Sequence, residues 1–219
     1  MVSAMWWVLR TGAPWRDVPR EFGPWSSVYT RWRRWSRQGM WRRVMRSLRR
    51  HATGKLRLLD CSHIKLHQHG ANPAGGQAIQ AIGRTKGGLN TKLAALTDAR
   101  GRIIDLALAA GPRHDQYAVL PLLAHARGRW LVADRGFDSD IFRHRLHRLR
   151  IRACIPPLPN RKRSLPCHRG FYRHRHKVEN CFGRIKRFRR IATRYDKLAS
   201  TFDAFLCFAI TLDWLTDQV

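Results

Sequence analysis

The chain has 219 residues, of which 44% are hydrophobic, so it can form one sizeable core and is too apolar to be disordered throughout. Its 43 Lys and Arg residues oppose 14 Asp and Glu residues, and the net charge of +29 indicates a polyanionic partner, for which nucleic acid fits best. No apolar run reaches the roughly 18 residues of a membrane span and no secretory signal is visible, so we expect a cytoplasmic protein with no membrane partner.

The first fifty residues are rich in Trp and Arg and contain two predicted helices, at residues 4–10 and 26–50, with turn-forming residues between them. Three apolar residues fall on one face of the second helix: Val28, Trp32 and Trp35. Arginines occupy most of its remaining surface. We expect residues 1–52 to be a partial helical DNA-binding segment. The alternative is a helix that docks through its Trp side chains and leaves a solvated basic face.

Residues 53–219 have a different pattern, in which short apolar runs alternate with amphipathic stretches. The predicted strands are residues 56–59, 93–96, 103–109, 130–133 and 153–155. The predicted helices are residues 115–126, 139–150, 172–190 and 202–215. Three consecutive strands, of which the last two are joined by a predicted hairpin turn at residues 97–101, are followed by strands that alternate with helices. This order predicts an α/β domain, with a mixed sheet flanked by helices.

Two carboxylates follow predicted strands in this acid-poor chain. Asp60 comes directly after the run LRLL, and Asp134 comes directly after WLVA. Side chains at strand ends gather at the rim of a sheet, and paired carboxylates suit a hard divalent cation. Singly, each residue could equally be an ordinary turn or cap residue.

The predicted helix at residues 172–190 presents one polar face. Four residues at spacings of three, four and seven fall within an arc of roughly 60°: Tyr172, Arg175, Glu179 and Lys186. A neighbouring apolar stripe would seat the helix on the sheet: Val178, Phe182 and Ile185. Glu179 alone could be a surface ion-pair partner, but its alignment with the other three polar residues favours a site.

The spacing of these four residues resembles the Y-R-E-K signature of bacterial insertion-sequence transposases of the acidic-triad (DDE) type, which have an RNase H-like core. Further segments resemble one branch of the same family: residues 11–17 (TGAPWRD), 82–88 (IGRTKGG), 133–139 (ADRGFDS) and 190–197 (RIATRYDK). The resemblance covers nearly the whole chain. It implies an RNase H-like fold for residues 53–219 and a nucleoid-associated protein of the bacterial cytoplasm.

The resemblance also implies the site residues. Asp60, Asp134 and Glu179 would be the catalytic triad and would bind two Mg²⁺ (or Mn²⁺) ions, with Asp60 bridging both and each of the others holding one. Arg175 and Lys186 would hold DNA phosphates near the cut. The remaining member of the signature, Tyr172, would line the site.

The implied reaction is metal-dependent phosphodiester hydrolysis at the ends of a mobile element, followed by strand transfer into target DNA. The implied partner is double-stranded DNA, and holding two ends together suggests a homodimer. Relatives carry a longer segment before the region that begins this chain, so we expect the end-recognising part to be short. Two alternatives stay open: a truncated protein that occupies the ends without cutting, and a non-mobile RNase H-like nuclease.

A glycine-rich basic loop at residues 83–88 offers two further phosphate-binding candidates, Arg84 and Lys86. The loop lacks the G-x-x-x-x-G-K-[ST] form of a nucleotide-binding loop, so we expect contact with the DNA backbone and not with ATP. Several histidines could act as acid or base: His63, His67, His69 and His114. In so basic a chain we expect them to have phosphate-contacting or surface roles.

Overall fold

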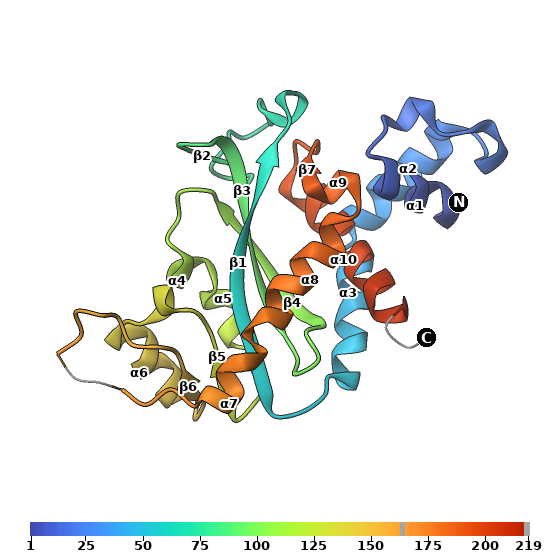
Figure 1. The fold of residues 1–219 in the computed structure, drawn as a ribbon. Coiled ribbons are helices and arrows are strands. Elements are labelled where there is room, and N and C mark those ends of the chain that lie inside the picture. Colours follow the sequence, from blue (N-terminus) through green and yellow to red (C-terminus); the bar gives the residue numbers. More distant parts are fainter. Residues whose placement is uncertain (163–164, 217–219) are drawn as a thin grey trace.

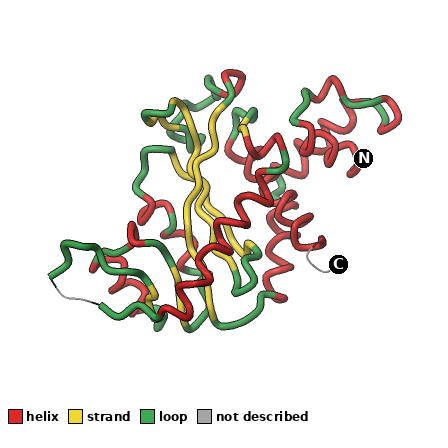
Figure 2. Tube along the Cα trace, in the orientation of Figure 1, coloured by secondary structure: helices red, strands yellow, loops and turns green. Residues whose placement is uncertain are grey.

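The computed structural model describes residues 1–162 and 165–216. A twisted sheet stands at its centre with helices on both faces, and the helices of the N-terminal segment lie to one side (Figure 1). Figure 2 shows the long strands side by side at the centre of the molecule, with the C-terminal helices next to them.

The sheet is mixed, and its strands are β1 (Leu56–Leu66), β2 (Gly83–Thr85), β3 (Gly88–Thr97), β4 (Ile103–Ala110), β5 (Trp130–Val132), β6 (Arg152–Cys154) and β7 (Thr193–Arg194). Strands β1, β3 and β4 pair antiparallel in chain order, while β5 lies parallel to β1 and β6 lies parallel to β5. The resulting order β4–β3–β1–β5–β6 is that of the RNase H-like fold. The predicted fold class is therefore confirmed.

Two short strands extend this framework. Strand β2 pairs with the first residues of β3, and β7 pairs in parallel with the last residues of β1. Because β5 pairs only with Leu56 to Leu58 and β7 only with Lys65 and Leu66, the middle of β1 has no neighbour on that side among the described residues. This gap leaves the edge of β1 near Asp60 without a strand partner.

The helices are α1 (Val2–Thr11), α2 (Trp25–Arg37), α3 (Met40–Leu48), α4 (Asp115–Ala118), α5 (Leu120–Leu123), α6 (Asp140–Arg148), α7 (Arg169–Tyr172), α8 (His176–Lys186), α9 (Arg189–Ala192) and α10 (Ala199–Thr216). Helix α8 packs on β1, and α10 packs on α8, α3 and β4. Helices α4 and α5 contact the central strands, and α6 packs on β6. Within the described parts of the chain, none of the helices has the length and apolar character needed to span a lipid bilayer.

Short 3₁₀ turns link these elements: η1 (Trp15–Asp17), η2 (Arg20–Phe22), η3 (Arg49–His51), η4 (Gln68–Gly70), η5 (Arg135–Phe137) and η6 (Arg173–Arg175). The turn η6 joins α7 to α8, so the helical segment that carries the Y-R-E-K residues begins at Arg169 and ends at Lys186. The predicted helix at residues 172–190 was therefore right in kind but displaced at both ends.

The predicted helix at residues 26–50 is in fact two helices, because Gly39 has a φ of 62° and interrupts the helix between α2 and α3. The predicted apolar face of α2 is confirmed. Val28 and Trp32 are buried, and the Trp32 ring stacks on Phe205 of α10 with centroids 4.0 Å apart. The division of the chain at residue 52 stays a prediction.

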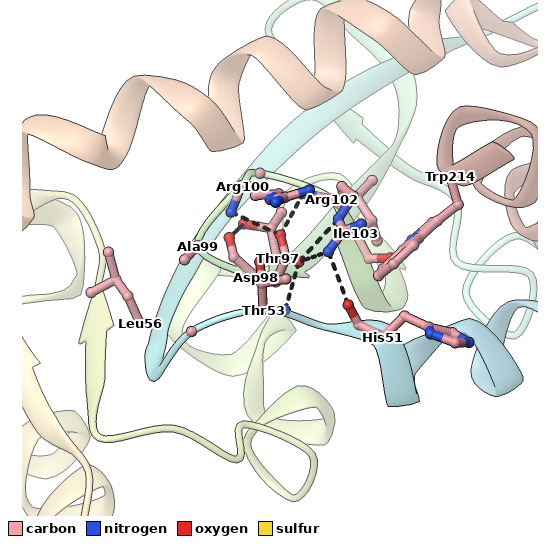
Figure 3. Close-up of polar contacts among 12 residues, drawn as sticks. His51, Thr53, Leu56, Thr97, Asp98, Ala99, Arg100, Arg102, Ile103 and Trp214 are labelled. Atoms are coloured by element: carbon pink, nitrogen blue, oxygen red, sulfur yellow. Dashed lines mark hydrogen bonds and ion pairs between the residues drawn. The ribbon is translucent and has the colours of Figure 1, made fainter. Parts of the chain in front are cut away.

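The turn between β3 and β4 is a junction of four parts of the chain (Figure 3). The fully buried Asp98 carboxylate accepts hydrogen bonds from Thr53 N at 3.1 Å and from Arg102 Nη2 at 2.7 Å. The Arg102 guanidinium lies 4.0 Å from the ring centroid of Trp214 on α10. Lys177 Nζ of α8 donates to the Ala99 carbonyl oxygen at 3.1 Å. The turn therefore holds α8, and with it Glu179, against the sheet.

Candidate active site

The parallel register of β1 and β5 brings the two aspartates together. Leu58 of β1 lies opposite Val132, the last residue of β5, and each aspartate follows two residues later in the chain. Because side chains alternate between faces with a period of two, Asp60 and Asp134 project from the same face at the same height. The sequence-based prediction that these two acids share a site agrees with this placement.

The local setting of each aspartate differs from that predicted. Asp60 does not end its strand, since β1 continues to Leu66, and Asp60 is 8% exposed within it. The polar second half of β1 was missed because it lacks the apolar run by which the first half was recognised. Asp134 does follow β5 and precedes η5, but its side chain makes no capping hydrogen bond. Neither residue is therefore an ordinary turn or cap residue.

The third carboxylate comes from α8, which crosses β1 (Figure 1). Val178, Phe182 and Ile185 are buried beneath the helix, as predicted, and Glu179 lies on its exposed side. The Arg175 guanidinium stands among all three acids. Its Nη1 forms an ion pair with the Glu179 carboxylate, one helical turn away.

The other end of the Arg175 guanidinium reaches the sheet. Arg175 Nη2 lies 3.1 Å from Asp60 Oδ2 and 3.8 Å from Asp134 Oδ2. One cation thus joins three carboxylates that are separated by up to 119 positions in the sequence. The structure brings together the three predicted triad residues, and Arg175 provides positive charge among them.

Two features around Asp134 bear on whether these residues could hold a metal ion. Asp134 Oδ1 is buried without a hydrogen-bond partner, so this oxygen lacks the donor or cation that a buried carboxylate requires. A Cβ atom on Gly136 would lie 3.1 Å from the same oxygen, so a side chain there would crowd it. Carboxylate oxygens are the ligands that hard divalent cations prefer. With Arg175 between them, no three such side chains among the described residues yet stand close enough to enclose an ion.

Burial and the repulsion between like charges both disfavour a site in which all three carboxylates are ionised. Burial raises the pKa of Asp60 to about 6, and the charges of Asp134 and Glu179 act in the same direction. The Cys61 backbone N–H, which donates to Asp60 Oδ1 at 2.8 Å, and the Arg175 guanidinium oppose that rise only in part. Although burial disfavours its charge, Arg175 has a raised pKa because Asp60 and Glu179 attract the proton. A second source of positive charge would stabilise the site further.

The two remaining signature residues flank the acids. Lys186 Nζ donates to Ser62 Oγ at 2.6 Å and to the His63 carbonyl oxygen at 3.0 Å, so it lies over β1 just beyond Asp60. Burial lowers the pKa of the Lys186 ammonium. Burial also raises the pKa of the Tyr172 hydroxyl, which lies at the Asp134 end of the site. The four residues therefore line up along the acids as their spacing predicted.

The structure does not bring Arg84 and Lys86 into this cluster. Arg84 lies opposite Leu89, six residues along β3 from Ala95, which faces Asp60. At roughly 3.3 Å per residue, the separation is on the order of 20 Å. Both cations are exposed at the edge of the sheet.

The four histidines also lie apart from the acids. His63 Nδ1 is 2.9 Å from Asn90 Oδ1, and the rings of His67 and His69 pack against each other. His114 accepts a hydrogen bond from the Gln116 backbone at the start of α4. None of these contacts places an imidazole among the carboxylates.

One positioning contact was missed in the sequence. Gln116 Nε2 donates to the Gly136 carbonyl oxygen at 2.9 Å, and Ser139 Oγ donates to Gln116 Oε1 at 2.6 Å. These bonds hold the loop after Asp134 against α4. A lone Gln at the start of a predicted helix gives no signal for such a role.

Two family profiles match the chain: one described as "Putative transposase of IS4/5 family (DUF4096)" over residues 1–45, and one described as "Transposase DDE domain" over residues 131–216. A Brucella ovis protein, "Putative transposase for insertion sequence element IS6501", is 31% identical over 129 residues, which cover 58% of this chain and 99% of that protein. The chain belongs to the insertion-sequence transposases. This transposase is accordingly a DNA-cutting and strand-transferring enzyme, as its Y-R-E-K residues predicted.

Other similarities are more limited. The transposase is 31% identical over 70 residues to "Uncharacterized protein y4sN" of Sinorhizobium fredii, covering 32% of this chain and 56% of that protein. It also matches the solved structure of a pre-cleavage Mos1 transpososome, with a TM-score of 0.32, 11% identity, and 87% and 77% of the two chains covered. A Mos1 strand transfer complex matches with a TM-score of 0.33, 12% identity, and 87% and 76% covered.

Proposed function

We propose that the transposase cleaves phosphodiester bonds at the ends of a mobile element with Asp60, Asp134 and Glu179 as its metal-binding triad. The observation that supports this most directly is their convergence from β1, β5 and α8 on a single guanidinium. A structural ion pair needs one carboxylate, whereas three carboxylates around one cation leave an excess of negative charge. That excess fits divalent metal ions better than it fits a stabilising contact.

Two Mg²⁺ or Mn²⁺ ions are the proposed cofactors, and Asp60, Asp134 and Glu179 would hold them. Bound there, such ions would activate water or a DNA 3′-hydroxyl and would neutralise charge on the phosphate. The partnerless Asp134 Oδ1 is available to a ligand without breaking an existing hydrogen bond. For Asp60 and Glu179, the Arg175 contacts would have to be exchanged.

Arg175 would then be freed to hold the scissile phosphate. Its guanidinium is planar and can form two parallel hydrogen bonds to a phosphate as readily as to a carboxylate. Lys186, held over β1 by Ser62 and His63, would contribute a fixed positive charge beside it. Positive groups fixed in advance stabilise the negative charge that increases during phosphoryl transfer.

The N-terminal segment, residues 1–52, is the proposed contact for element ends. On α2, the side that faces away from Trp32 carries exposed Arg33, Arg34 and Arg37. These side chains are free to neutralise DNA phosphates, and binding would weaken steeply with salt. Exposed Arg84 and Lys86 would contact the backbone farther from the cut. Double-stranded DNA at the element ends and at the target is the proposed partner, and a homodimer would hold two ends together in the cytoplasm, at the nucleoid.

The test is cleavage of end-bearing DNA in Mg²⁺ by the wild type and by Asp134→Asn protein. Asp140→Asn is the matched control, because the Asp140 side chain is 87% exposed and, among residues 1–162 and 165–216, its ion-pair partner is Arg161. We expect the control to cut normally and Asp134→Asn to lose at least 100-fold in rate, on the order of one removed transition-state contact. Equal cleavage by all three proteins would remove Asp134 from the site. DNA binding without any Mg²⁺-dependent nicking by the wild type would support a protein that occupies ends without cutting. Cleavage that ignores the end sequence would support a non-mobile nuclease.

A further inference from the structure

A cavity of about 430 Å³ lies away from the carboxylates and is lined largely by cations. Its lining comes from the end of α3 and η3, the start of β1 and the segment after α5. Five of the lining residues are arginines and one is a histidine: Arg46, Arg49, Arg50, Arg57, Arg127 and His125. None of the residues that line it is acidic, so the cavity gathers positive charge on its walls.

The cavity opens on the other face of the sheet from the proposed active site. Arg57 and Asp60 are three residues apart on β1, so their side chains project from opposite faces. Asp105 on β4 confirms the assignment. Asp105 pairs with Leu96 of β3, and Leu96 pairs with Leu59 of β1. Leu59 is two residues from Arg57, so these side chains project from the same face of the sheet. Any ligand of this cavity would therefore bind independently of the triad.

Only part of the cationic cluster is neutralised by the protein. The buried Asp105 carboxylate lies 3.2 Å from Arg49 Nη2 and 2.6 Å from His125 Nδ1. Among residues 1–162 and 165–216, no carboxylate forms an ion pair with Arg46, Arg50 or Arg127, which are all exposed at the rim. Several like charges around one cavity repel one another unless an anion joins them.

Arg57, one of the lining residues, is held in place by the protein backbone. Arg57 is only 8% exposed, and its Nη1 donates to the carbonyl oxygens of Thr53 at 3.3 Å and Gly54 at 2.9 Å. Its Nε is buried with no hydrogen-bond partner. Burial lowers the pKa of the guanidinium. Arg57 is therefore a fixed positive charge in the wall of the cavity, held by backbone carbonyl oxygens.

We propose that this cavity binds the phosphodiester backbone of a second DNA segment, distinct from the segment held by the triad. Arginines match phosphate oxygens in shape and charge, and exposed arginines on both walls suit a polymer that passes over the rim. No Phe, Tyr or Trp is among the residues that line the cavity, so the contacts would be to the backbone and recognition would be independent of sequence. The proposal rests on the proposed DNA-cutting function, in which DNA extends beyond the phosphate that reacts at the triad.

The first experiment compares two variants that lose the same charge. Arg46→Gln/Arg127→Gln removes one cation from each wall of the cavity, and Arg145→Gln/Arg148→Gln removes two exposed cations of α6. Fluorescence anisotropy with a duplex of unrelated sequence, in EDTA and at several salt concentrations, gives the salt dependence of binding. The slope of log binding constant against log salt concentration changes by roughly 0.9 for each phosphate contact. We expect the cavity variant, which loses two contacts, to reduce this slope by about two units and the control to change it by less than half as much. Equal changes in both variants would overturn the proposal.

A second measurement leaves the arginines of the cavity unchanged. Phenylglyoxal modifies accessible arginines, and peptide mass spectrometry reports the rate at each of them. Duplex DNA should protect Arg46, Arg50 and Arg127 at least several-fold, equally in the wild type and in Asp134→Asn protein. Unchanged reaction rates with DNA would overturn the proposal, as would protection by inorganic phosphate but not by duplex. Both measurements are made without metal, whereas the cleavage test of the triad requires Mg²⁺. A failure of this proposal can therefore be distinguished from a failure of the proposed function.

Discussion

Asp98→Asn should destabilise the transposase strongly although Asp98 lies outside the proposed active site. Its carboxylate is 0% exposed and accepts six hydrogen bonds, from Thr53 N and Oγ1, Arg100 N, and Arg102 N, Nε and Nη2. Removing one partner of a buried ion pair costs about 3–5 kcal/mol. Asn can keep the two backbone bonds to Oδ1, so we expect about 3 kcal/mol, a large part of the roughly 5–15 kcal/mol of a typical domain.

Urea unfolding followed by tryptophan fluorescence measures this difference. With a slope near 3 kcal/mol per molar urea, the midpoint should fall by about 1 M. Asp140→Asn is again the control, because its exposed carboxylate should contribute little, and its midpoint should stay near that of the wild type. A shift for Asp98→Asn no larger than that of the control would refute the role assigned to the turn.

The difference in unfolding free energy between the wild type and Asp98→Asn should depend on pH. Burial alone would raise the pKa of Asp98, but the bonds from Arg102 and Thr53 outweigh it, so the pKa is lowered. A carboxyl with a lowered folded pKa contributes stability above its unfolded pKa of about 3.9, and loses it as the pH falls through the folded pKa. The difference between wild type and Asp98→Asn should therefore be constant from pH 7 to 5 and shrink below pH 4. A constant difference down to pH 3 would contradict this assignment.

Three other changes have clear expected outcomes. Because burial raises the pKa of Asp60 to about 6, its charge opposes folding above that pH, so Asp60→Asn should raise the thermal midpoint of the metal-free protein at pH 7.5 while abolishing cleavage; a lower midpoint would argue against the pKa. Gly39→Ala should lower the unfolding free energy by about 1 kcal/mol in urea melts, since φ is 62° between α2 and α3, and no loss would mean that the turn adapts. Trp32→Ala should cost about 3–5 kcal/mol in the same melts, because the ring is fully buried against Phe205, and a loss under 1 kcal/mol would contradict that packing.

The sequence carried enough local information for the layout of the catalytic domain. Apolar runs such as LRLL and WLVA mark buried strands because they remove surface from water wherever they lie, and their order with the helices predicts the mixed sheet. The alignment of Tyr172, Arg175, Glu179 and Lys186 follows from helix geometry alone. These features depend on residues within about four turns of one another, so they can be read without knowing the rest of the chain.

Tertiary structure decided the features that join distant residues. The pairing of Leu58 with Val132 places Asp60 beside Asp134, and the packing of α8 on β1 sets Arg175 among the acids; neither follows from local periodicity. The length of β1 was also missed, because its polar second half is stabilised by pairing with β3 and not by burial of an apolar run. The cationic cavity combines arginines from positions 46 to 127. Composition predicts that so basic a chain binds a polyanion, but only the fold gathers those charges at one place, since strand pairing and helix packing determine which distant residues meet.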